Sequence, residues 1–312
     1  MVAYQTPDPL QRCLASLHGE GAAIVVVADN GADDETPRVV LRELPQAMYR
    51  NFADNPGYGA AVNRVRADVD TPFLVILNAD TELDPGALRA LGTYLERHPN
   101  VGLVGPRLRN ADGSLQPSCY PTATPWQLLL QESRFGALTR WVPWVRRRHL
   151  RTWPHDYDRR VPWVLGAALA IRLSAFDAVG GFDESYFLYY EEVDLCHRLG
   201  KAGWEVHFTP TAEVIHHGGV STSTLGPAVA QIFFTSAARF HRTHRGAGSW
   251  IAFRAVVVAV AAAQLARCFV SGCIEKRSAK RVSRSATVRA WRAVLHDALT
   301  GWPAEQLESR QP

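Results

Sequence analysis

The sequence predicts an α/β protein in which a mostly parallel central sheet is flanked by helices, with further helices at the C-terminus. Short apolar runs of strand length alternate with amphipathic segments of helical length through the first third of the 312 residues. Polar residues follow directly after several of these runs. Beyond Ser223 the pattern is helical throughout. A chain of this length can form one large domain or two.

The run Phe73–Leu77 is the central element of this prediction. Five consecutive apolar residues, bounded by Thr71-Pro72 and a polar turn, are typical of a strand buried on both faces. Its carboxyl end carries Asn78 and Asp80, and ligands of open α/β sheets bind beyond that end. A carboxylate there suits a divalent cation. The alternative for this stretch alone is a strand followed by a helix-capping turn.

The other elements follow in order. We expect helices at residues 9–17, 36–44, around 60–63, at 85–97 and 191–202. We expect strands at residues 24–28, 48–51, 101–104, 164–171 and 204–208, with residues 214–219 closing the mixed region. Residues 117–162 are rich in Pro, Trp and Arg and show no clear period.

Composition describes an ordinary globular protein. The hydrophobic content is 47%, the charged content 21%, and the formal net charge of +4 is too small to indicate a partner class. Five cysteines are scattered without a CxxC pair, which favours a reducing cytosol and argues against a zinc site or a disulfide framework. No signal peptide is expected at the start.

Six separated motifs occur in a specific order. They are residues 27–31 (VADNG), 55–59 (NPGYG) with Asn63, 77–80 (LNAD), 181–184 (GFDE), 191–194 (EEVD) and 216–219 (HHGG). Together they resemble the inverting family 2 glycosyltransferases of GT-A fold, and most of all the bacterial rhamnosyltransferases that extend lipid-linked glycans. The resemblance covers roughly residues 2–222.

The resemblance implies a cation site at Asp80 and His216. Asn78 stands where many members of the family have a second aspartate, so a further ligand is needed, and an imidazole favours Mn²⁺ over Mg²⁺. Adjacent residues of a strand point to opposite sides, so at most one of His216 and His217 is expected to bind. The alternative is a polar pair at a strand end.

The resemblance also implies a site for the nucleotide-sugar donor. Asp29 matches the residue that contacts the pyrimidine, and Gly57 and Gly59 permit close approach of the backbone. The remaining donor-binding candidates are Tyr4, Asn55, Asn63 and Asn78. Ordinary turns at residues 29–31 and 55–59, without a ligand, are the alternative.

The implied catalytic base is Glu192, at the start of a helix and opposite the metal. The family usually has aspartate there. Helix N-termini attract acids for stability alone, but three acids in one turn exceed that need, and their mutual repulsion raises proton affinity. The implied acceptor-binding residues are Trp163, Gly166, Asp183, Glu184 and Glu191.

Residues 251–270 are apolar but include Arg254, Gln264 and Arg267, and the longest uncharged run is too short to span a bilayer. A helix here either lies in the membrane interface or packs on the rest of the chain. The basic residues from Lys276 to Arg292 and the Trp- and Arg-rich residues 141–151 favour the membrane. No nucleic-acid-binding motif accompanies the Arg runs.

The sequence therefore predicts a GT-A catalytic domain at residues 1–222 and a helical, membrane-associating region with a basic tail at residues 223–312. The implied activity is inverting transfer of L-rhamnose from dTDP-L-rhamnose to a polyprenyl-diphosphate-linked or other cell-envelope glycan, with Mn²⁺ or Mg²⁺, on the cytoplasmic face of the membrane. The alternative is a non-catalytic sugar-nucleotide-binding protein of the same fold. No GxGxxG motif or basic phosphate loop supports a dehydrogenase or a nucleotidyltransferase. The first strand of the family begins upstream of Ala3-Tyr4-Gln5, so this strand is either curtailed or starts before Met1.

Overall fold

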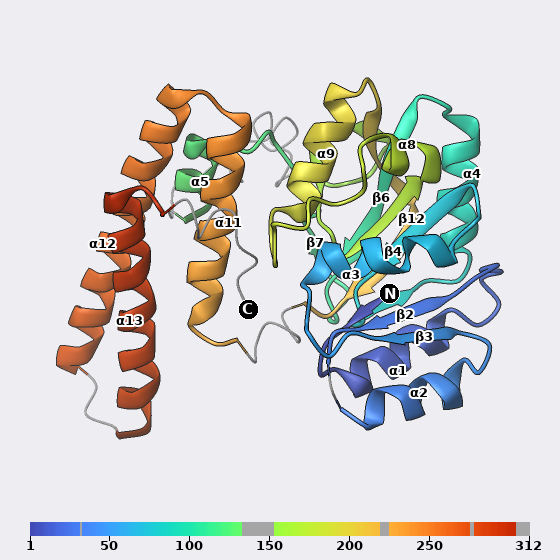
Figure 1. Cartoon of the computed structure of the whole chain (residues 1–312), viewed down its shortest axis with the longest axis horizontal. Coiled ribbons are helices and arrows are strands. Elements are labelled where there is room, and N and C mark those ends of the chain that lie inside the picture. Colours follow the sequence, from blue (N-terminus) through green and yellow to red (C-terminus); the bar gives the residue numbers. More distant parts are fainter. Residues whose placement is uncertain (32, 133–152, 219–224, 275–277, 304–312) are drawn as a thin grey trace.

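The computed structural model describes residues 1–31, 33–132, 153–218, 225–274 and 278–303. Three parallel strands form its first sheet, with β2 (Val26–Asp29) between β1 (Val2–Ala3) and β3 (Met48–Asn51). A parallel bridge between Val2 and Asn78 joins this sheet to a second, larger one. The two sheets are therefore neighbours along one edge (Figure 1).

The larger sheet is mixed. Its strands run in the order β4 (Phe73–Leu77), β11 (Ala168–Arg172), β6 (Val101–Arg109), β12 (Glu205–His216) and β5 (Thr81–Leu83). The short strands β7 (Leu115–Gln116) and β9 (Arg159–Arg160) pair with β6 and β12, and β8 (Cys119–Tyr120) pairs with β10 (Trp163–Val164).

The direction of the long strands decides where the polar strand ends meet. β11 is antiparallel to both β4 and β6, whereas β6 and β12 are parallel. The expected parallel arrangement therefore holds for β1 to β3, and β4, β6 and β12 also share one direction, but β11 lies reversed between them. As a result, the carboxyl ends of β1, β2, β4 and β12 lie at the same edge of the sheet.

Several boundaries differ from those predicted. The strand expected at residues 164–171 is two strands, β10 and β11, separated by a turn at residues 165–167. The strand expected at residues 204–208 continues to His216 after an irregularity, because its second half pairs with β5. Thr81–Leu83, expected as a turn, is β5 itself.

Two hydrophobic cores cover the two faces of the sheet. Ile76 and Leu77, successive residues of β4, point into different cores, which confirms that the strand is covered on both sides. One core includes residues of α1 (Pro7–Ser16), α2 (Glu35–Glu43) and α4 (Ala87–Arg97). The other includes residues of α3 (Tyr58–Val65), α8 (Leu173–Ala178) and α9 (Glu191–Lys201). A 3₁₀ turn, Arg66–Asp68, follows α3.

The C-terminal helices form a separate layer beside α9 (Figure 1). They are α11 (Ala228–His244), α12 (Ala247–Ile274) and α13 (Ser278–Thr300), joined by α5 (Pro125–Glu132). A third core holds them together and includes Tyr186, Tyr190 and Val193. The helical layer is thus packed directly against the aromatic segment that precedes α9.

Within the described residues, one stretch, Ala247–Val270 of α12, is long and apolar enough to cross a membrane, and 22% of the tested window is buried. The expectation that this stretch is too short was based on its longest uncharged run alone. Arg254 interrupts that run, but its guanidinium folds back onto α13, where Nε donates to the carbonyl of Ala298 at 2.8 Å. Residues 141–151, Lys276 and Arg277 lie outside the described residues.

Candidate active site

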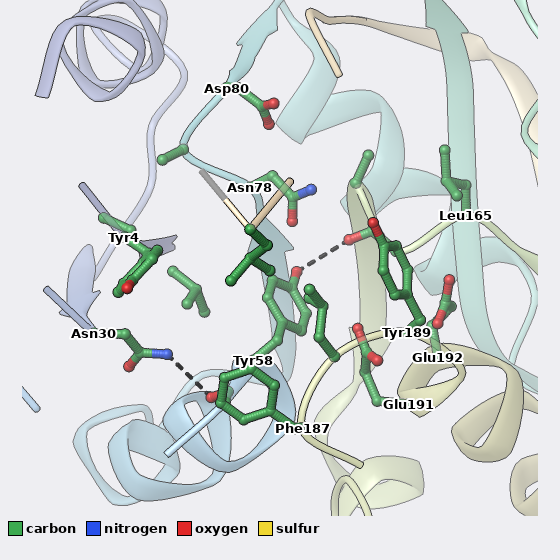
Figure 2. A pocket seen from close by; sticks show the side chains of 18 of the residues that line it. Tyr4, Asn30, Tyr58, Asn78, Asp80, Leu165, Phe187, Tyr189, Glu191 and Glu192 are labelled. Atoms are coloured by element: carbon green, nitrogen blue, oxygen red, sulfur yellow. Dashed lines mark hydrogen bonds between the residues drawn. The ribbon is translucent and has the colours of Figure 1, made fainter. Parts of the chain in front are cut away.

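A cavity of about 270 Å³ opens at the edge where the carboxyl ends of the strands meet (Figure 2). Nine of the fifteen predicted site residues line it: Tyr4, Asn55, Gly57, Asn78, Asp80, Gly166, Glu191, Glu192 and His216. Figure 2 shows Asn78 and Asp80 on one side and Glu191 and Glu192 on the other, with Tyr58 between them. The structure therefore brings the candidate metal ligands and the candidate base to one cavity.

The Asp80 side of the cavity has the donor atoms of a cation site. Asp80 and His216 are both buried, and Nε2 of His216 lies 3.4 Å from Oδ1 of Asp80. His217 points elsewhere and contacts Glu82 through Nε2 at 2.6 Å, as the alternation of strand side chains predicts. Pairing of β5 with β12 places Thr81 opposite His216, and this register brings the two chain segments together.

These residues fit a hard divalent cation. Two donor atoms on adjacent positions around one ion, each about 2.1 Å from it, lie roughly 3 Å apart, close to the observed separation. Asn78 also lines the cavity. Its Oδ1 is buried and has no hydrogen-bond partner among the described residues. No group of three or more His, Cys, Asp or Glu side chains suited to a metal occurs in the described part of the chain. With Asp80 and His216 as its two protein ligands, the ion would keep other coordination positions for diphosphate oxygens.

The opposite wall carries two adjacent buried carboxyls in the first turn of α9. Burial raises the pKa of Glu192, while hydrogen bonds from backbone groups, including those of Gly166 and Val193, act in the opposite direction. Burial, followed by repulsion from Glu192, raises the pKa of Glu191 well above its usual range. One oxygen of each carboxyl, Oε2, is buried without a hydrogen-bond partner among the described residues.

The third acid of that turn plays a different part from the one predicted. Asp194 is buried and accepts hydrogen bonds from Nε of Arg198 at 2.6 Å and from Nε2 of His244 at 2.6 Å. It therefore anchors α11 to α9 rather than facing the cavity. Burial, and not repulsion among three acids, is the main reason for the raised pKa of Glu192.

Tyr58 lies between the two walls. Its hydroxyl donates to the carbonyl oxygen of Gly166 at 3.0 Å. Its pKa is raised well above the ordinary value by burial and then by the nearby charges of Glu191, Glu192 and Asp80. Because the Tyr58 hydroxyl lies close enough to Asp80, Glu191 and Glu192 for each charge to raise its pKa, the three carboxyls surround the same cavity.

The loop before α3 joins the cavity floor to the aromatic segment. Gly57 has a φ of +90°, and a Cβ there would lie 2.5 Å from the carbonyl oxygen of Phe187. The amide of Tyr58 donates to that same oxygen at 3.0 Å, and Nδ2 of Asn30 donates to the carbonyl of Gly57 at 3.1 Å. Glycine is required here because the two loops touch through their backbones.

Six predicted site residues do not line the cavity: Asp29, Gly59, Asn63, Trp163, Asp183 and Glu184. The side chain of Asp29 is fully buried, and it accepts hydrogen bonds from the amide of Gly31 at 2.8 Å and from the hydroxyl of Tyr49 at 2.7 Å. Its neighbour Asn30 lines the cavity instead.

Asn63 and Gly59 hold the turn at residues 180–184 against α3. Asn63 donates to the carbonyl of Phe182 at 2.9 Å and accepts from the amide of Phe182 at 3.0 Å. A Cβ on Gly59 would lie 2.8 Å from Cβ of Phe182. Glu184 accepts from Asn63, and Asp183 lies 3.5 Å from Arg239 of α11. These motif residues have packing roles in the structure.

Trp163 stacks on Tyr120 at 4.3 Å between ring centroids, beside the cavity wall rather than in it. Sequence reasoning missed the cavity residues Tyr58, Leu165, Phe187 and Tyr189, and also Gln116, whose Oε1 lies 2.8 Å from Nδ1 of His216. Tyr58 lay inside a quoted motif. The others carry no local signal, because they reach the site only through tertiary contacts.

A family model described as glycosyltransferase like family 2 matches residues 1–236. The chain belongs to the family 2 glycosyltransferases. The structure of this glycosyltransferase is accordingly of the GT-A type, with a mixed sheet, flanking helices and additional C-terminal helices.

Among characterised relatives, the glycosyltransferase is 38% identical over 240 residues to the N-acetylglucosaminyl-diphospho-decaprenol L-rhamnosyltransferase of Mycobacterium tuberculosis, covering 71% of this chain and 76% of the relative. It is 37% identical over 84 residues, 27% of this chain and 29% of the relative, to the rhamnosyltransferase WbbL of Escherichia coli.

Among solved structures, a mannosyltransferase from Pyrobaculum calidifontis, in complex with GDP-Man and Mn²⁺, aligns with a TM-score of 0.53. The alignment covers 96% of this chain and 85% of the other at 16% identity. At that identity the likeness supports the fold alone.

Proposed function

We propose that this glycosyltransferase transfers L-rhamnose from dTDP-L-rhamnose to a polyprenyl-diphosphate-linked saccharide, with inversion at the anomeric carbon. The observation that carries the proposal is the single cavity with Asp80 and His216 on one wall and Glu192 on the other. Similarity to the mycobacterial L-rhamnosyltransferase over 71% of the chain supports the donor sugar and the class of acceptor.

Asp80 and His216 would hold a divalent cation, with Mn²⁺ suited to the imidazole ligand. When bound, such an ion neutralises charge on the diphosphate leaving group. Tyr4, Asn55 and Asn78 line the same cavity and would orient the donor. The buried amide oxygen of Asn78, which lacks a partner among the described residues, is suited to accept a donor hydroxyl or to face the cation.

Glu192 would take the proton from the acceptor hydroxyl as that oxygen attacks the anomeric carbon. Burial raises its pKa, and a base with a raised pKa accepts a proton more readily at neutral pH. Its Oε2 is buried and has no hydrogen-bond partner among the described residues, so its lone pairs would be available to the acceptor hydroxyl. Attack from the Glu192 wall while the leaving group is held at the Asp80 wall inverts the anomeric centre in one displacement.

We further propose that residues 1–222 form the catalytic domain and residues 223–312 a membrane-associating region, so that the enzyme acts on the cytoplasmic face of the membrane. The outward side of α12 supports this, because Ile251, Phe269 and Val270 are large apolar residues with 65%, 73% and 58% exposure. Exposed Arg289 and Arg292 on α13 favour an anionic surface. A lipid-linked acceptor is found only at such a surface.

The test is a transfer assay on the full chain. The purified protein is incubated with Mn²⁺, a GlcNAc-diphospho-polyprenol and one of three donors: dTDP-L-rhamnose, UDP-GlcNAc or GDP-mannose. We expect a product heavier by one deoxyhexose from dTDP-L-rhamnose alone, with inverted configuration by NMR. Transfer from another donor only would overturn the assignment of rhamnose. Binding of donors without turnover on any acceptor would favour the non-catalytic alternative.

A further inference from the structure

Gln116, at the end of β7, contacts the candidate metal ligand His216 through a defined hydrogen-bond network. Its Oε1 lies 2.8 Å from Nδ1 of His216. Its Nε2 donates to Oδ1 of Asn110 at 2.9 Å and to the main-chain carbonyl of His216 at 3.3 Å. Because both donors are used elsewhere, the carboxamide oxygen is the end that faces the imidazole.

This contact determines which nitrogen of His216 carries the proton. A carboxamide oxygen only accepts, so the proton lies on Nδ1 and the lone pair lies on Nε2. Nε2 is also the nitrogen that lies 3.4 Å from Oδ1 of Asp80. The atom able to bind a cation therefore points to the carboxylate that would share it.

Hydrogen bonds of Asn110 and Ser114 fix the orientation of the Gln116 carboxamide. Asn110, which accepts from Gln116, donates through Nδ2 to Oγ of Ser114 at 2.9 Å, and its amide donates to the carbonyl of Ser114 at 2.9 Å. These contacts lie in the β6–β7 hairpin, where Leu108 pairs with Gln116. Through Gln116, the hairpin thus holds the imidazole of His216, which lines the cavity, in one orientation.

We propose that Gln116 is a positioning residue for the cation site, which holds His216 in the Nδ1-protonated tautomer with Nε2 directed to the ion beside Asp80. The inference rests on the metal ligands assigned in the proposed function. It adds a residue that touches neither substrate nor ion. Partners of this kind typically change metal affinity 10- to 100-fold when removed.

The alternative is that Gln116 only fastens the hairpin to the end of β12. The two readings differ in metal selectivity. An imidazole held in place favours Mn²⁺, whereas Mg²⁺ prefers oxygen ligands and gains less from it. Loss of orientation should therefore weaken Mn²⁺ binding more than Mg²⁺ binding, while general loosening should weaken both equally.

The experiment measures binding of Mn²⁺ and of Mg²⁺ to the full chain by calorimetry, without donor or acceptor, for wild type, Gln116→Leu, Gln116→Glu and His216→Ala. Gln46→Leu, on an exposed loop, is the matched control. We expect Gln116→Leu to weaken Mn²⁺ binding about 10- to 100-fold with a smaller change for Mg²⁺. Gln116→Glu, which keeps an acceptor for Nδ1–H, should restore most of the affinity.

The outcomes separate this inference from the proposed function. If His216→Ala weakens Mn²⁺ binding but Gln116→Leu does not, or lowers both ions equally, the positioning role is wrong and the ligand assignment stands. If His216→Ala has no effect, the ligand assignment is wrong as well. Because no sugar is present, failure to transfer rhamnose leaves the result for Gln116 unaffected.

Discussion

Glu192 shows how one side chain acquires its chemistry from its position. It lies in the first turn of α9, where backbone amides favour a carboxylate, yet it is 7% exposed, and burial raises its pKa. Gly166 approaches it closely, since a Cβ on Gly166 would lie 3.4 Å from Cβ of Glu192. The site therefore favours a carboxyl that takes up a proton more readily than one in water.

Glu192→Gln should lower the rate of transfer by at least about 100-fold, because the amide cannot accept the proton of the acceptor hydroxyl. Binding of dTDP, measured by calorimetry, should be retained. In the wild type, kcat/KM should fall on acidification, and it should do so at a higher pH than for an ordinary carboxyl because the pKa is raised. A variant with unchanged turnover would remove Glu192 from the role of base.

Gly57 offers a second test at this scale. Gly57→Ala must place a Cβ 2.5 Å from the carbonyl oxygen of Phe187, with φ at +90°. We expect a loss of several kcal/mol in the free energy of unfolding and loss of transfer. Gly86→Ala is the matched control, because Gly86 has a φ of +86° but nothing within 4 Å of the added Cβ.

Gly86→Ala should cost only about 1 kcal/mol and leave activity intact. Chemical denaturation of both variants provides the comparison. Equal effects of the two substitutions would show that backbone conformation alone matters and that the contact with Phe187 does not.

The roles of residues that follow from a local sequence pattern were predictable, and the roles that depend on contacts between residues far apart in the sequence were not. Asp80 and Glu192 follow a strand and begin a helix, so the sequence placed them correctly in the cavity. Asn63 and Gly59 also lie in motifs, but they hold Phe182, and a motif alone does not separate packing from binding. Gln116 reaches His216 across 100 residues, so its role needed the structure.

At the scale of elements, α9 connects the cavity to the C-terminal helices. Its first turn carries Glu191 and Glu192, while Asp194 on the same helix binds His244 of α11. Ser236 of α11 also donates to the carbonyl of Leu188, a cavity residue, at 2.9 Å. Movement of α11 would therefore reach the cavity through two contacts.

The packing of α11 should make stability depend on pH. Burial lowers the pKa of His241 to about 4, with a further contribution from Arg245, whereas the unfolded value is near 6.5. The unfolded chain then binds more protons between those values, so stability is present above about pH 6.5 and is lost as pH falls toward 4. This contribution lowers the midpoint of thermal unfolding from pH 7.5 to 5, whereas the raised pKa values of Glu191 and Glu192 act in the opposite direction, so the effect of His241 is measured as a difference between variants.

His241→Met, which replaces the titratable ring with an apolar side chain against Phe253, should flatten part of this dependence. Burial likewise lowers the pKa of His197 to about 4, so some dependence will remain. A slope unaffected by the substitution would contradict the assignment.

The sheet topology illustrates the limit of prediction for elements. The alternation of strands and helices predicted a parallel sheet, and the first three strands obey it. β11 is antiparallel to β4 and β6 and follows the turn at residues 165–167. An apolar run has the same pattern in either direction, so the sequence did not indicate this reversal. That turn brings Gly166 to the cavity.

At the scale of the whole molecule, α11 lies between α12 and α9, whose first turn lines the cavity (Figure 1). We expect the protein to bind vesicles that contain an anionic lipid, and to do so less well at high salt. Ile251→Ser combined with Phe269→Ser removes two exposed apolar side chains, so binding should fall by at least roughly 100-fold, given about 1.5–3 kcal/mol for each.

Leu41→Ser is the control, since Leu41 is 69% exposed but belongs to α2, which lies far from α12 (Figure 1). It should leave vesicle binding unchanged. Sedimentation of the three proteins with vesicles measures the difference. Equal binding by the double variant would mean that the outer side of α12 does not meet the membrane.

The most direct test of the account is the position of a bound cation. Crystals of the full chain grown with Mn²⁺ and dTDP, measured at the manganese absorption edge, should give an anomalous peak about 2.2 Å from Asp80 and His216. The diphosphate should lie in the same cavity, with Glu192 across from it. A peak away from Asp80 and His216, or a nucleotide in a cavity that excludes Glu192, would contradict the proposed arrangement.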